Sequence, residues 1–486
     1  MDALGRLLEW QYLGVVEVAW IVLLATYILL ERRSPVATLA WILALGFLPG
    51  IGLFVYVVFG PRRLERKRIR RALARSVVMS GEAARAVRAN RLLLSIAAGH
   101  GHRSMSLAEL AVRSGEAPPA RCDSVRILPS GKECYASILE AIRAARHHVH
   151  LEYYIFEEGV VAEKLRDALV ERAKAGVKVR LLLDGLGSRG LPDSFLEPLE
   201  AAGGEVAWFL PIAFSRLRPR LVNFRTHRKI VICDGRVGFT GGMNVQDGHD
   251  EDASGALAWR DTQVRLEGDA VGALQLVFLE DWQFATGGVP HGDGYVHAPT
   301  GEGEHLVQIV ASGPDPDAQF AIHKQYFAAI AGARERVFVS TPYFVPDEAT
   351  VLALCTAARR GVDVRILVPA RGDHRIVDAA ARSYFPELLA TGVRVFAYGP
   401  PVLHAKTLVV DRHYAAIGTA NVDNRSFHLN FEVTAAVYSG EIADELATLF
   451  ERDLAKAAEI TGEQLEKQGL AERLFESAAR LLSPIL

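Results

Sequence analysis

Most of the chain after residue 120 alternates between two hydrophobic patterns. Apolar positions three or four apart predict helices at 136–146 and 161–175, whereas short apolar runs predict strands at 149–156 and 177–183. Gly176 follows the second helix at the position where glycine commonly ends a helix. The spacing therefore predicts a unit in which helices and strands alternate.

The same order of elements occurs a second time. Helices are expected at 320–334 and 349–360 and strands at 337–344 and 362–368, and a glycine again follows the second helix. The chain is therefore interpreted as a tandem duplication of an α/β unit. Strands that alternate with helices predict mostly parallel sheets, and we expect the two units to meet at one active-site cleft.

Two apolar runs near the N-terminus have the length of membrane-spanning helices. The first covers 12–30 with Glu17 as its one charge, and the second covers 37–60 with Pro49 and Gly50 in its middle. Pro49-Gly50 fits both a kink in a spanning helix and the tip of a re-entrant hairpin, so the topology of the second run stays open.

Eight arginines and lysines between positions 62 and 75 follow these runs. The positive-inside rule places everything after them in the cytoplasm. Beside a membrane, such a cluster favours contact with anionic lipid over nucleic acid.

These patterns divide the chain into five predicted parts. They are a membrane region with two apolar helices (1–60), a basic helical linker (61–120), a first domain (121–297), a second domain (298–462) and a C-terminal amphipathic helix (463–486). The last helix either docks on the fold or lies on the membrane.

Composition supports this division. Half of the residues are hydrophobic and the mean hydropathy is +0.14, which is high for a soluble enzyme, while the net charge is only −2. Cys122, Cys134, Cys233 and Cys355 form no CxxC pair, so we expect four reduced structural thiols and no zinc site.

One motif, H-x-K-x4-D-x6-G-x-x-N, occurs once in each unit. Its residues are His227, Lys229, Asp234 and Asn244 in the first copy, and His404, Lys406, Asp411 and Asn421 in the second. The four residues between lysine and aspartate are apolar or β-branched, which predicts a buried strand. The alternative explanation is that both histidines are structural, but two copies that share the downstream glycine and asparagine favour a catalytic role.

The residue types suit a phosphate diester. One imidazole can attack phosphorus while the other protonates the leaving oxygen, and the lysines and asparagines can hold the phosphoryl oxygens. Because lysine supplies the cations, we expect no metal ion and no organic cofactor.

Each histidine needs an acid to orient it, and an acid begins the apolar strand that follows each motif. We expect Asp261 to pair with His227 and Glu432 with His404. Asp234 and Asp411 lie several residues beyond their histidines, and for them we expect a structural role without contact to phosphate.

These residues resemble the HKD motifs of the phospholipase D superfamily, and the whole chain is similar to the membrane-anchored bacterial cardiolipin synthases. The matching stretches are 29–33, 38–45, 151–156, 183–189, 225–230, 259–262, 341–347, 424–432 and 480–484. The hydroxyl that often follows the motif glycine is Thr419 in the second copy, but the first copy has Gly242 there.

The resemblance implies tandem phospholipase D-like domains and a two-step transfer. One histidine attacks phosphatidylglycerol and releases glycerol, and a second phosphatidylglycerol then takes the phosphatidyl group to give cardiolipin. By analogy His227 is the nucleophile and His404 the general acid and then base, and the HKD residues Asp234 and Asp411 count among the catalytic set. The implied location is the bacterial inner membrane, with the catalytic domains in the cytoplasm. A hydrolase that uses water as acceptor is the alternative.

Overall fold

A computed structural model gives the arrangement of these elements. It describes residues 22–23, 26, 29–30, 38–39, 42–43, 76–78, 81, 87, 102–211, 224–290, 294–314 and 320–485. The predicted spans at 12–30 and 37–60 lie almost entirely outside the described residues, and the basic stretch at 62–75 lies wholly outside them. No helix that these residues form is both long and apolar enough to cross a membrane.

The first half follows the predicted alternation of helices and strands. Its elements are β1 (Ala120–Leu128), α8 (Gly131–Ala144), β2 (His148–Tyr153), α9 (Val160–Lys174), β3 (Lys178–Asp184), α10 (Asp193–Ala201), β4 (Glu205–Phe209), β5 (Ile230–Cys233), β6 (Val237–Gly241), η5 (Asp247–His249), α12 (Glu251–Ser254), η6 (Gly255–Leu257), β7 (Gln263–Gly268) and α13 (Ala270–Thr286).

The second half repeats this order with a few additions. Its elements are β8 (His305–Ser312), α14 (Ala321–Gly332), β9 (Arg336–Ser340), β10 (Phe344–Val345), α15 (Glu348–Arg359), β11 (Asp363–Pro369), α16 (Arg375–Arg382), α17 (Phe385–Thr391), β12 (Arg394–Tyr398), β13 (Thr407–Val410), β14 (Tyr414–Gly418), β15 (Val422–Asp423), α18 (Asn424–His428), β16 (Glu432–Val437), α19 (Gly440–Leu454), β17 (Ala457–Glu459), α20 (Gly462–Glu466), α21 (Leu470–Arg480) and η7 (Ser483–Ile485).

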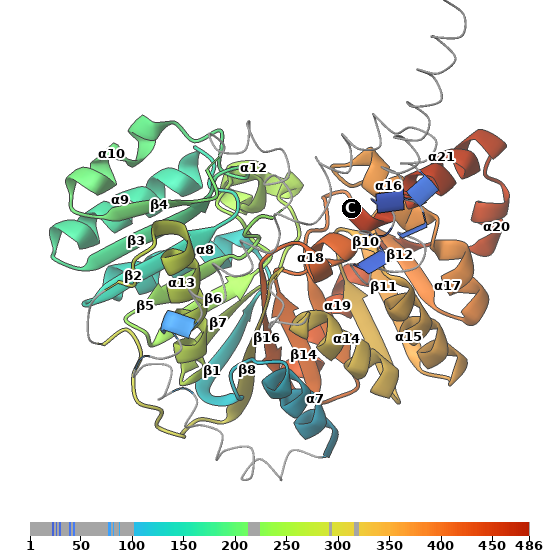
Figure 1. Cartoon of the computed structure of the whole chain (residues 1–486), viewed down its shortest axis with the longest axis horizontal. Helices are drawn as coiled ribbons and strands as arrows, with labels where there is room; N and C mark the ends of the chain where they lie inside the picture. The colour runs from blue at the N-terminus through green and yellow to red at the C-terminus, as the bar shows by residue number, and fades with distance from the viewer. Residues whose placement is uncertain are drawn as a thin grey trace, which may run out of the picture. The chain divides into compact units, whose positions relative to one another are not determined.

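One continuous sheet runs through both halves. Its strand order is β17-β12-β11-β9-β13-β14-β16-β8-β1-β7-β6-β5-β2-β3-β4. The first half lies on the left of Figure 1 and the second on the right, and β1 and β8 lie side by side where the halves meet. The order on one side of this junction mirrors the order on the other, which confirms the tandem duplication.

The prediction of mostly parallel sheets is wrong. Only the pairings β2–β3, β3–β4, β9–β11 and β11–β12 of the large sheet are parallel. Each motif strand instead lies antiparallel to its neighbours, β5 between β2 and β6 and β13 between β9 and β14. The short turns after β5 and β13 leave no room for a crossover helix, so these strands form hairpins.

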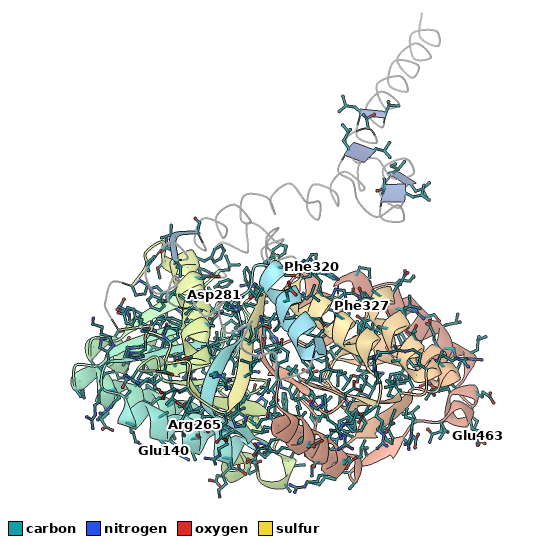
Figure 2. The ribbon with its side chains drawn as sticks, turned by 90° about the horizontal axis from the view of Figure 1, so that it is seen from below. Glu140, Arg265, Asp281, Phe320, Phe327 and Glu463 are labelled. Carbon is teal, nitrogen blue, oxygen red and sulfur yellow. The ribbon has the colours of Figure 1, made fainter. Side chains whose placement is uncertain are left out.

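Part of the segment before β1 packs against the second half. Helix α7 (His102–Arg113) buries Ala108 and Ala111 in the core of the second half. Gln308 Nε2 on β8 donates to the carbonyls of Ala108 at 3.1 Å and Ala117 at 2.9 Å. Figure 2 shows α7 beside α14, the helix that carries Phe327.

The C-terminal helix docks on the fold. Arg382 Nε on α16 donates to Glu476 Oε1 on α21 at 2.8 Å, and the Tyr384 hydroxyl bonds Ser483 at 2.9 Å. The opposite face of α21 stays exposed, including Leu470 and Leu474.

Candidate active site

Both predicted motif strands are confirmed. The four residues between Lys229 and Asp234 form β5, and those between Lys406 and Asp411 form β13. All eight strand residues are buried. Each histidine lies three residues before its strand, and Lys229 and Lys406 donate from Nζ to the carbonyl oxygens of their own motif histidines.

The acids are exchanged between the halves, so the predicted pairing is wrong. His227 Nδ1 lies 3.0 Å from Glu432 Oε2, and His404 Nδ1 lies 2.6 Å from Asp261 Oδ2. Each histidine therefore takes its acid from the other half. A proton donated from Nδ1 to the carboxylate leaves Nε2 of each ring free for chemistry.

The backbone explains the exchange. The His227 N–H donates to the Phe431 carbonyl, just before Glu432, at 2.9 Å. In the same way, the His404 N–H donates to the Arg260 carbonyl, just before Asp261, at 2.7 Å. Because each histidine segment hydrogen-bonds to the other half, each ring faces that half's acid.

The departure from the motif at Gly242 has a steric cause. A Cβ atom at Gly242 would lie 2.0 Å from Asp261 Oδ1, so a side chain there would displace the carboxylate. In the second half Thr419 occupies this position, and its hydroxyl donates to Glu432 Oε2 at 2.5 Å. Thr419 thus contacts the acid, and its carbonyl lies 3.1 Å from His227 Nδ1.

The two lysines share one buried centre. Burial, followed by repulsion from Lys406, lowers the pKa of Lys229 to about 7. Burial lowers the pKa of Lys406 to about 8, although Asp261 and Glu432 oppose the change. Burial is the first cause of both shifts, so an anionic ligand would favour the charged forms of the two lysines.

The histidines are held neutral without a ligand. Burial, opposed by Glu432 and assisted by Lys229, lowers the pKa of His227 to about 4. Burial, Lys406, Lys229 and His227 lower the pKa of His404. Their side chains are 11% and 9% exposed, respectively, so each ring keeps a small area in contact with solvent.

The pKa values of the two acids shift in opposite directions. Burial would raise the pKa of Glu432, but the charge and hydrogen bond of His227 outweigh it and lower the pKa. For Asp261 burial dominates over Lys406 and the pKa is raised. Glu432 therefore loses its proton more readily than Asp261.

Asp234 and Asp411 lie at the far ends of the motif strands. Asp234 accepts from the backbone N–H groups of Arg146, His147 and His148 at 2.8 to 2.9 Å. Asp411 accepts in the same way from the N–H groups of 334–336. Each aspartate lies seven positions beyond its histidine in the chain, roughly 20 Å at strand rise. These contacts support the structural role expected of both aspartates.

Asn244 and Asn421 are both buried. Asn244 Oδ1 accepts from the Ile155 N–H at 3.3 Å. The Oδ1 atom of Asn421 has no hydrogen-bond partner among the described residues, and its amide interacts with Asp423.

Two further residues, Tyr154 and His249, lie at the centre. Tyr154 packs edge-on against His227 with ring centroids 5.1 Å apart, and Lys229 Nζ lies 5.4 Å from the centre of its ring. His249 is fully buried, its ring lies 5.2 Å from that of His404, and its Nδ1 lies 3.7 Å from Asp261 Oδ2. No strand pattern marks His249, because it lies in the short turn η5.

A metal ion bound beside His404 would lie close to the positive charge of Lys406. His249, Asp261 and His404 offer ligand atoms within 4.8 Å of one another. Lys406 Nζ lies 2.9 Å from His404 Nδ1, so a dication there would be repelled. The lysines therefore supply the positive charge.

Two acid–histidine pairs and two lysines in one buried centre define a class, the phosphodiester-processing enzymes of the phospholipase D superfamily. The family model described as Cardiolipin synthase, PLD-like domain, matches residues 138–253 and 326–454. The model described as Phospholipase D-nuclease N-terminal matches 18–61.

The chain is 39% identical over 483 residues to Cardiolipin synthase 1 of Bacillus anthracis, which covers 98% of this chain and 94% of that relative. It is 41% identical over 468 residues to Cardiolipin synthase 2 of Bacillus cereus, covering 96% and 90%. It therefore belongs to the cardiolipin synthase family and is a phosphatidyltransferase. The N-terminal match indicates membrane association.

The fold has a solved counterpart. A phosphatidylserine synthase from Haemophilus influenzae aligns with a TM-score of 0.61 at 14% identity, and covers 78% of this chain and all of the other. This likeness concerns the fold alone.

Proposed function

We propose that the centre transfers a phosphatidyl group from one phosphatidylglycerol to another, which gives cardiolipin and glycerol. The observation that carries this proposal is the buried pair of crossed acid–histidine contacts beside two lysines of lowered pKa. A phosphate diester would favour the charged forms of both lysines, which burial disfavours.

In the first step His227 Nε2 attacks phosphorus, and the bond between phosphorus and the oxygen of the headgroup glycerol breaks. His404 gives its proton to that oxygen, and glycerol leaves. In the second step His404 takes the proton from a hydroxyl of the second phosphatidylglycerol. That oxygen attacks phosphorus, and the phosphorus–nitrogen bond breaks to restore His227. The anionic substrate would raise the pKa of His404 and so allow it to act as an acid.

Product analysis tests the proposal. Purified enzyme with phosphatidylglycerol in detergent should form cardiolipin and glycerol, separated by thin-layer chromatography; phosphatidic acid would mean that water is the acceptor. The His227→Ala and His404→Ala variants should each lose at least about a thousandfold in rate. Rapid quenching in denaturant at neutral pH, followed by mass spectrometry, should find the phosphatidyl group on the peptide that contains His227; a phosphatidyl group on His404 would reverse the two roles.

We also propose that residues 1–60 anchor the enzyme in the inner membrane, with both catalytic domains in the cytoplasm. The described helical positions of this region support it, because their apolar side chains are exposed: Val22, Leu23, Leu29, Leu30, Leu39 and Leu43. The enzyme should resist carbonate extraction, and a cysteine introduced after residue 75 should be protected from impermeant reagents in intact cells. We further propose the domain limits 121–297 and 298–462, which limited proteolysis can test.

A further inference from the structure

A second group of metal-ligating side chains lies outside the catalytic centre, among the ends of three helices. His323 is in the first turn of α14, Asp347 caps the start of α15, and His428 ends α18. Each offers one ligand atom, and the three atoms lie within 4.8 Å of one another. All three residues are half-buried, so solvent can reach the group.

The geometry is close to that of a metal site. His323 Nε2 lies 3.2 Å from Asp347 Oδ2, the separation of two ligands that share one ion at roughly 2.0 to 2.2 Å each. The His323 ring stacks on Phe427 at 4.6 Å, and His428 meets Phe320 edge-on at 4.6 Å. Aromatic packing therefore fixes both imidazoles, and Figure 2 shows Phe320 at the margin of the body.

Hydrogen bonds hold the ligand atoms of two of these residues in place. Asp347 Oδ1 accepts from the Thr350 N–H at 2.9 Å, and His323 Nε2 lies 3.3 Å from the Thr350 hydroxyl. A metal ion would replace the proton between His323 and Asp347.

We propose that His323, Asp347 and His428 bind one divalent transition-metal ion of the Zn²⁺ class and so tie α18 to α14 and α15. Two imidazoles and a carboxylate are a common three-residue ligand set for Zn²⁺, with water as the fourth ligand. Helix α18 lies between Asn421 and Glu432 in the chain, so the ion would stabilise a segment next to the catalytic residues.

Calorimetric titration of the full-length enzyme with Zn²⁺, after treatment with EDTA, tests this. We expect one ion per chain and a raised midpoint of thermal unfolding. His428→Gln and His323→Ala should each weaken binding by more than about tenfold. The exposed His413→Ala should bind as wild type.

His249→Ala separates this site from the catalytic centre. Binding kept in His249→Ala and lost in His428→Gln supports the proposal, whereas the reverse pattern overturns it, as does the absence of binding. In EDTA His428→Gln should unfold like wild type; if it does not, the binding measured for His323→Ala decides. The result is independent of cardiolipin formation.

Discussion

At the scale of single residues, Gly242 decides whether the second acid can reach its histidine. A Cβ atom there would meet Asp261 Oδ1 at 2.0 Å. Gly242→Ala should therefore displace the carboxylate, cost about 1–3 kcal/mol of unfolding free energy and sharply reduce cardiolipin formation. Gly190→Ala is the control, because no atom lies within 4 Å of its Cβ position. Equal activities of the two variants would contradict the steric argument.

The lysine pKa values predict an unusual dependence on pH. In the free enzyme Lys229 and Lys406 lose their protons near pH 7 and 8. The value of kcat/KM, which reports the free enzyme, should therefore fall as pH rises through this range, while kcat holds to higher pH because bound phosphate retains the protons. Lys132→Ala, at the surface, should leave the profile unchanged. A kcat/KM that stays constant up to pH 10 would refute the prediction.

The same pKa shifts determine whether the lysines make the free energy of unfolding rise or fall with pH. Both lysines have lower pKa values in the folded chain than the usual 10.5, so between about pH 7 and 10.5 the unfolded chain binds more protons. The contribution of these lysines to the free energy of unfolding should therefore rise with pH over this range. Substitution of both lysines by methionine should remove that part of the pH dependence in urea titrations.

At the scale of elements, the crossed contacts predict which residues are energetically coupled. Asp261 bonds His404, whereas Glu432 bonds His227. A double-mutant cycle on the free energy of unfolding should give about 0.5–3 kcal/mol for Asp261→Asn with His404→Gln, and near zero for Asp261→Asn with His227→Gln. Strong coupling in the second cycle would support pairing within each half instead.

The sequence predicted the helices, the strands and the two motifs because these depend on local periodicity. It did not predict the pairing of acids, since that depends on which backbone segments meet across the two halves, as His227 meets Phe431. The sequence contains a local signal for the first hairpin, the dipeptide Asp234-Gly235 after β5, whose residues have φ of 54° and 63°. We interpreted Asp234 as part of the motif and therefore did not predict the hairpin turn.

The histidines at 147, 148 and 150 illustrate a different limit. Nothing in the local sequence at this helix–strand junction marks them as buried, yet His148 and His150 are fully buried and both contact Gln275 Oε1 on α13, at 3.0 and 3.2 Å. Burial at this position comes from the packing of α13, more than a hundred residues later, which no local pattern contains.

At the scale of the whole molecule, one chain should be the smallest active unit. Both histidines, both acids and both lysines come from one chain, and the sheet that carries them is continuous through β1 and β8. Two inactive chains, His227→Ala and His404→Ala, should therefore fail to restore each other when they are co-expressed with different tags and purified through both. As a control, wild-type chain co-purified with either variant should keep its own cardiolipin-forming activity, which would show that an inactive partner does not inhibit it. Cardiolipin formation by the doubly inactive pair would mean that the centre is shared between chains, and the crossed contacts would then have to form between molecules.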